Sequence, residues 1–153
     1  MAPIGSYKRY FELADIYSGV QSVTVYEQGI AEAIKCLHNP FKSTVPEAET
    51  RRDIAQAYAG VAEVCLSDLL QEKEAEAKCK EAMEQGLQMD KTCIDVHVQL
   101  ANYLMWKDRF DEARVELVEI QRWVMEAREE YETEVVSTIG KYLLEVEEYK
   151  RSY

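Results

Sequence analysis

The sequence predicts an all-α protein, a helical solenoid of about seven helices stacked as antiparallel pairs. Three observations favour this fold class. Apolar residues recur three and four positions apart along most of the chain, which is the spacing of one face of an α-helix. Only three Pro and six Gly occur in 153 residues, so long helices with few turns are expected. No segment shows the period-two alternation of a half-buried strand.

The N-terminal half is expected to contain four helices, each with an apolar face. The first should end at Gly19, a helix stop signal, and the second before Asn39-Pro40, which disfavours helix. The third carries apolar residues from Ile54 to Leu69 at helical spacing, and the fourth should break at Asp90. The expected ranges are 6–18, 20–37, 48–70 and 73–89.

Three further helices are expected in the C-terminal half. The fifth ends at the charged sequence WKDRF, a tight connection to the sixth, which begins near Phe110. The seventh has an apolar face from Val135 to Val146. The Glu-rich residues 145–153 should form a turn and the opening of another helix. The fifth and seventh helices are expected over 94–106 and 133–146, and Phe110, Ala113, Leu117 and Ile120 mark the sixth.

The third helix pair shows a spacing of small and large residues that is typical of a known repeat. Ala101 and Ala113 are small enough for close helix contact, and larger residues fill the groove: Leu100, Leu104, Phe110, Leu117 and Ile120. The pattern resembles the tetratricopeptide-repeat (TPR) family, whose pairs stack because one pair cannot bury its own apolar face. We expect residues 1–153 to be a single TPR domain, an N-terminal fragment of a longer repeat protein. Its repeats would cover about 6–37, 48–90, 93–126 and, in part, 132–153.

Three stretches carry a more specific resemblance. They are residues 17–30 (YSGVQSVTVYEQGI), residues 57–82, with SDL at the centre of an extra-long second repeat, and residues 142–149 (YLLEVEEY). They resemble the eukaryotic family of dedicated assembly chaperones of large-subunit ribosomal protein four. The resemblance implies capture of a very basic ribosomal protein, its protection from aggregation and its escort to the nucleus during ribosome biogenesis. It also implies a location in the cytoplasm and nucleus.

The charge of the chain agrees with a basic protein partner. Eighteen Lys and Arg against 29 Asp and Glu give a formal net charge of -11. Nucleic-acid binding depends chiefly on clusters of basic residues, so direct binding of nucleic acid is not expected. No apolar run approaches the roughly 20 residues that span a bilayer, and the first six residues lack the features of a secretory signal. We therefore expect a soluble, intracellular protein without membrane contact.

The residues that could carry catalysis or bind a metal show no suitable arrangement. His38 is expected in an exposed turn and His97 on a helix surface, away from any HExxH or catalytic spacing. The cysteines are too far apart for a zinc motif and should be small buried thiols in a reducing compartment: Cys36, Cys65, Cys79 and Cys93. We expect no enzymatic activity, no cofactor, no metal site and no small-molecule substrate.

Partner binding is expected on the concave face, which in such repeats is lined by the first helix of each pair. Carboxylates there could form charge-assisted hydrogen bonds with Lys or Arg of a bound segment. Glu63 is the strongest candidate because it lies beside Gly60, the one glycine in a long helix, where another backbone can come close. The predicted partner-binding residues are Glu12, Asp15, Glu63, Asp95, Gln99, Asn102, Trp106 and Glu134.

Two other functions are compatible with the same scaffold. A co-chaperone adaptor would bind acidic tails of heat-shock chaperones with Lys, Asn and Arg at fixed groove positions, but of the matching residues only Lys8 agrees. A general scaffold in a larger complex is the second alternative, because repeat folds bind many unrelated partners. The sequence leaves the bound segment, the release mechanism and the oligomeric state undetermined.

Overall fold

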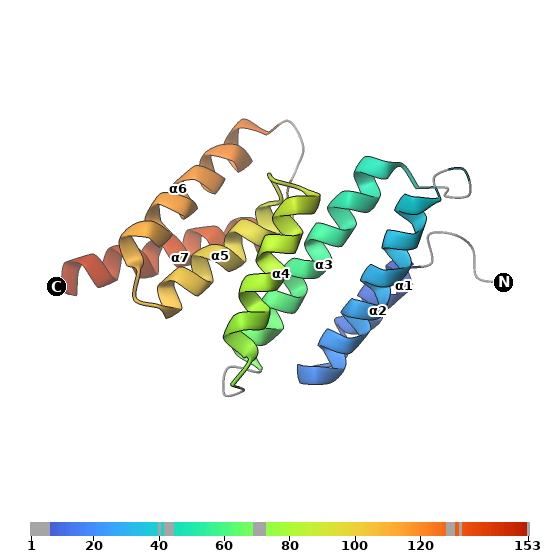
Figure 1. Ribbon diagram of the computed structural model, residues 1–153. Coiled ribbons are helices and arrows are strands. Elements are labelled where there is room, and N and C mark those ends of the chain that lie inside the picture. The colour runs from blue at the N-terminus through green and yellow to red at the C-terminus, as the bar shows by residue number, and fades with distance from the viewer. Residues whose placement is uncertain are drawn as a thin grey trace. The chain divides into compact units, whose positions relative to one another are not determined.

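A computed structural model describes residues 7–39, 41, 45–68, 73–127, 131 and 133–152. Over these residues it contains seven α-helices and no strand, which confirms the predicted fold class (Figure 1). The chain divides into two compact units, Met1–Val96 and His97–Tyr153. The single domain with four repeats stays a prediction. The helices are α1 (Tyr7–Ala14), α2 (Gly19–His38), α3 (Glu47–Ser67), α4 (Ala75–Met89), α5 (Ile94–Trp106), α6 (Phe110–Glu126) and α7 (Thr133–Ser152).

The first unit is built from two antiparallel helix pairs. Helix α1 packs against α2, α3 packs against α4, and α2 also contacts α3 (Figure 1). The residues on which these contacts depend are small and buried, so the helix backbones approach closely. They include Ala14, Ser22, Ala62 and Cys79. One apolar cluster of the unit joins α1, α2 and α3 through Tyr7, Ile30, Ala33, Ile54 and Ala57.

The second unit contains most of α5 together with α6 and α7. Ala101 on α5 and Ala113 on α6 are fully buried, as expected for residues at the closest helix contact. Helix α7 runs antiparallel to α6, because the first residue of α6 meets the end of α7. The rings of Phe110 and Tyr149 stack there with centroids 3.7 Å apart. One turn further along α6, Arg114 donates a hydrogen bond of 2.9 Å to Glu147.

Two predicted helix ends are wrong. Helix α1 ends at Ala14, and Gly19 is the first residue of α2 rather than a stop. Its φ of 58° lies in the left-handed region that glycine adopts without strain. Residues 145–152 do not form a turn, because α7 continues to Ser152 with its end packed on α6. The sixth helix, which Phe110 to Ile120 marked in the sequence, runs to Glu126.

The cysteines lie wholly or partly inside the fold. Cys65, Cys79 and Cys93 are buried and Cys36 is half-buried, and all four are free. Their burial agrees with the expectation of small core thiols.

Every helix among the described residues is either too short or too polar to cross a bilayer.

Candidate functional site

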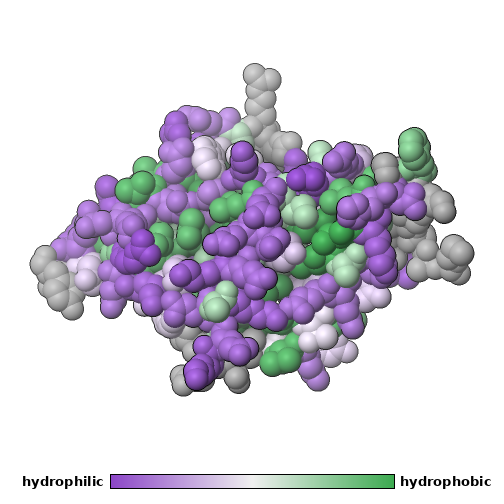
Figure 2. All heavy atoms as spheres, in the orientation of Figure 1, coloured by the Kyte–Doolittle hydropathy of each residue, from purple (hydrophilic) through white to green (hydrophobic). Residues whose placement is uncertain are grey.

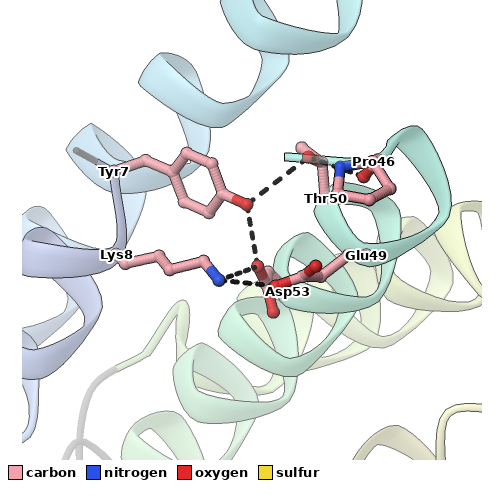
Figure 3. Close-up of polar contacts among 6 residues, drawn as sticks. All are labelled: Tyr7, Lys8, Pro46, Glu49, Thr50 and Asp53. Atoms are coloured by element: carbon pink, nitrogen blue, oxygen red, sulfur yellow. Dashed lines mark hydrogen bonds and ion pairs between the residues drawn. The ribbon is translucent and has the colours of Figure 1, made fainter. Parts of the chain in front are cut away.

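Helices α1 and α3 meet through a set of polar contacts, which Figure 3 shows. The Tyr7 hydroxyl donates a hydrogen bond of 2.7 Å to Asp53, and Lys8 donates one of 2.6 Å to Glu49. The Lys8 ammonium is also 3.7 Å from the Asp53 carboxylate. The hydrogen bond to Glu49 raises the pKa of Lys8, and burial raises the pKa of the Tyr7 phenol. At this end of the α1–α3 face, one internal cation therefore offsets part of the charge of the two carboxylates.

The other end of the α1–α3 face is organised around Tyr26 of α2. Its hydroxyl donates a hydrogen bond of 2.7 Å to Asp15, and its ring lies on Gly60. A Cβ at Gly60 would lie 2.5 Å from Cζ of that ring, so only glycine fits without displacing it. Burial raises the pKa of Tyr26 most, and the negative charges of Asp15 and Glu63 raise it further. Both carboxylates thus lie close to one phenol that stays protonated.

Glu63 is exposed. Gly60 permits close packing as predicted, but the group that approaches Gly60 is the ring of Tyr26 and not a backbone. On α3 the residues Glu49, Asp53, Gly60 and Glu63 recur at helical spacing and share one face. The same face therefore carries both the end at Lys8 and the carboxylates around Tyr26.

Two stretches near Tyr26 contain acidic residues and no basic ones. No Lys or Arg occurs in residues 10–34 or 53–72. Of the acids there, Glu27 pairs with Lys78 at 2.7 Å, Glu32 pairs with Lys35 at 3.0 Å, and Asp53 contacts Lys8. We use the name acidic end of the α1–α3 face for four other acids of these segments: Glu12, Asp15, Glu63 and Asp68. All four residues are exposed to solvent.

Three of the eight predicted binding residues belong to this acidic end. Glu12 precedes Asp15 by three residues, so the two lie one helical turn apart at the end of α1. Asp15 and Glu63 meet around Tyr26 although 48 positions separate them in the sequence. Sequence reasoning missed Tyr26 and Asp53 as members of this face. Gly60 was the available signal, because a glycine inside a long helix indicates that another group packs against it.

The other five predicted residues lie elsewhere. Asp95 is half-buried near the start of α5, at the end of the first unit. In the second unit, Asn102 is half-buried and Trp106 is 41% exposed, with the Lys107 ammonium 5.3 Å from its ring centroid. Glu134 is exposed on α7. Among the eight, contacts with Tyr26 bring Asp15 and Glu63 together, and helical spacing places Glu12 one turn from Asp15.

The prediction that Gln99 is available on a binding surface is wrong. Its side chain is buried, and its Oε1 has no hydrogen-bond partner among the described residues. Buried residues occupy most of the circumference of α5, so the rest of the fold covers this helix on nearly all sides: Ile94, Val96, Val98, Ala101, Tyr103 and Leu104. The face that carries Gln99 is therefore covered as well.

The placement of His97 on a helix surface is also wrong. Its ring lies between α5 and α6, where it contacts the Glu116 carboxylate and the edge of Trp123, with ring centroids 5.1 Å apart. Its side chain is only 13% exposed. His97 therefore contributes to the packing of this helix pair. His38, the last residue of α2, is exposed as expected.

The chemistry that these groups offer is recognition of cations. Among the described residues, no group of three or more His, Cys, Asp and Glu side chains could hold a metal ion. Burial raises the pKa of Cys79 and of Cys93 to about 12, so neither supplies a thiolate nucleophile near neutral pH. Exposed carboxylates that accept hydrogen bonds from Lys or Arg are the main functional groups of the α1–α3 face.

The antiparallel pairs with small residues at their contacts define the chain as an all-helical repeat protein. Its fold is similar to that of a solved structure, "Assembly Chaperone of RpL4 (Acl4) (Residues 1-338)", with a TM-score of 0.80. The two are 21% identical, and the match covers 96% of this chain and 58% of that one.

The sequence is similar to that of a protein with a related name. A curated protein of Schizosaccharomyces pombe, "Probable assembly chaperone of rpl4", is 24% identical over 153 residues, which cover 96% of this chain and 44% of the relative. The chain thus spans about half the length of the proteins it matches. No family model matches the chain. These comparisons confirm the predicted resemblance to the chaperones of this ribosomal protein.

Proposed function

We propose that this chain is a non-catalytic protein-binding module that captures a basic large-subunit ribosomal protein and acts as its dedicated chaperone during ribosome biogenesis. The observation that carries the proposal is the alignment of 96% of the chain with a relative named as an assembly chaperone of rpl4. We further propose that the module works in the cytoplasm and nucleus, where such a protein is made and assembled.

The acidic end of the α1–α3 face supports this proposal. Glu12, Asp15 and Glu63 are exposed, and no Lys or Arg occurs in residues 10–34 or 53–72. A Lys- or Arg-rich segment would gain charge-assisted hydrogen bonds there, and the field of the chain, with a net charge of -11, would speed the encounter. Binding of this kind is specific for cations and sensitive to salt.

The same geometry disfavours the co-chaperone alternative. An acidic tail would meet the carboxylates of the acidic end, and like charges repel. Lys8, the residue that agrees with that binding mode, is already held by Glu49 and Asp53. A tail would have to break these contacts before it could use the Lys8 ammonium.

Direct complex formation tests the proposed function. The chain is mixed at low salt with ribosomal protein four, or with a peptide that copies the acidic tail of a heat-shock chaperone, and is analysed by size-exclusion chromatography with light scattering. We expect a complex with the ribosomal protein, a loss of that complex as salt rises, and no complex with the peptide. The proposal is wrong if the ribosomal protein elutes separately at low salt, and the adaptor function gains support if the peptide binds.

A further inference from the structure

The turn between α1 and α2 exposes four large apolar side chains within eight residues. Ile16 is 79% exposed and Val20 is 64% exposed, while Leu13 and Tyr17 are each more than 40% exposed. We call these four residues the turn patch. Single exposed apolar residues are common on protein surfaces, but a cluster of them marks a site of interaction.

The geometry of such a turn does not require apolar residues. The corresponding connection between α5 and α6 has the charged residues Lys107, Asp108 and Arg109. Most of the surface that is visible in Figure 2 is hydrophilic. A polar sequence could therefore form the α1–α2 turn. Formation of the turn thus does not explain why the residues of the turn patch are apolar.

The turn patch is held in place by contacts on both of its sides. The Gly19 N–H donates a hydrogen bond of 3.0 Å to Asp68 at the end of α3. The Ser22 hydroxyl donates one of 2.9 Å to the Ala14 carbonyl, and the Tyr26 hydroxyl bonds Asp15. These three contacts fix the backbone of the turn. Binding of a ligand would therefore cost little conformational entropy of the protein at this surface.

Carboxylates surround the turn patch. Asp15 lies within the turn, Glu12 precedes it by one helical turn, and Asp68 is bonded to Gly19. A second copy of this acidic chain would bring like charges together at such a surface, whereas a basic segment would be attracted to it. Charge complementarity therefore identifies the occupant as a basic segment that also carries an apolar residue.

We propose that the turn patch anchors one large aliphatic or aromatic side chain of a partner segment whose neighbouring Lys or Arg residues contact Asp15 and the rest of the acidic end. This inference rests on the proposed function and specifies the segment that is bound. Basic charge gives rapid, salt-sensitive attraction, and the apolar anchor gives a contribution to affinity that salt does not screen.

The test uses the double variant Ile16→Ser/Val20→Ser, which removes exposed side chains and opens no cavity. The matched control is Val115→Ser/Met125→Ser on α6, where the two apolar side chains are 70% and 79% exposed. The probes are ribosomal protein four and two synthetic peptides of equal charge, rich in Lys and Arg, one with a central Trp and one with Ser at that position. Binding is measured by fluorescence anisotropy at low and at physiological salt, and circular dichroism checks the helix content.

We expect the turn-patch variant to bind the ribosomal protein and the Trp peptide about tenfold more weakly or worse, by a similar factor at both salt concentrations. The control should bind as the wild type does. Equal affinity of the wild type for the two peptides would overturn the inference, as would equal binding by the turn-patch variant and the control.

Failure of the proposed function has a different signature. If ribosomal protein four does not bind but the turn patch still distinguishes the two peptides, the chaperone function is wrong and the turn patch stands. If the wild type dimerises and the turn-patch variant is monomeric in light scattering, the surface joins two copies of the chain and the inference is wrong.

Discussion

Gly29 and Gly140 both lie inside helices, but their surroundings differ. A Cβ at Gly29 would lie 2.6 Å from Cε1 of Phe11 and 2.7 Å from Cβ of Tyr10, whereas a Cβ at Gly140 would have no heavy atom within 4 Å. Alanine favours a helix over glycine by about 1 kcal/mol, and overpacking costs about 1–3 kcal/mol. The contact with Cβ of Tyr10 cannot relax without moving α1, so overpacking should dominate at Gly29.

We therefore predict opposite effects for the two substitutions. Gly29→Ala should lower the free energy of unfolding by about 1–2 kcal/mol, and Gly140→Ala should raise it by about 1 kcal/mol. Urea unfolding followed by circular dichroism measures both. Changes of the same sign would contradict the packing of α1 against α2.

At the same scale, the sequence could predict some site residues and not others. Glu12, Asp15 and Glu63 follow from helical spacing, which is a local property of the chain. The burial of Gln99 does not follow from helical spacing, because it depends on the residues that pack against α5. The contact of Tyr26 with Gly60 joins α2 to α3 and therefore has no local signature in the sequence.

Among the elements, the pair formed by α5 and α6 depends on close backbone contact at Ala113. Ala113→Glu would place a longer, charged side chain where the native residue is fully buried. We predict that this variant unfolds its repeat and lowers the thermal midpoint strongly. Val115→Glu makes the same charge change on the same helix at a residue that is 70% exposed, and should leave the midpoint nearly unchanged. Similar midpoints for the two variants would show that α6 is placed wrongly.

The contact of α6 with α7 should depend on pH. The Arg114 guanidinium lowers the pKa of Glu147, so the folded state binds this proton less readily than the unfolded state does. The stabilisation is thus present above the unfolded-state pKa and is lost as pH falls through the folded-state pKa. Glu147→Gln should lower the thermal midpoint at neutral pH and have a smaller effect in acid. A difference from wild type that is independent of pH would exclude this ion pair as its source.

The extent of α7 shows where the sequence is insufficient at this scale. The Glu-rich residues after Val146 indicate a turn if only local polarity is considered. In the structure they continue the helix because Glu147, Tyr149 and Lys150 contact α6 at Arg114, Phe110 and Asp111. Helices with a clear apolar period, such as α5, were predicted with their full range.

For the whole molecule, the arrangement of charge matters more than its total. Many basic side chains are engaged in ion pairs within the chain, among them Lys8, Lys35, Lys78, Arg114 and Lys150. Residues 10–34 and 53–72, which carry the acidic end of the α1–α3 face, contain no Lys or Arg. Part of the surplus of acid thus lies there, next to an exposed apolar turn.

The central claim is that this acidic end binds a basic ribosomal protein, and titration of charge variants at two salt concentrations tests it most directly. The wild type, Glu63→Lys and Glu84→Lys are titrated calorimetrically with ribosomal protein four at low and at physiological salt. Glu84 is exposed on α4, so its reversal makes the same charge change away from the α1–α3 face. We predict that Glu63→Lys weakens binding about tenfold at low salt and less at higher salt, while Glu84→Lys binds nearly as the wild type does. Equal affinities of the two variants would contradict the account.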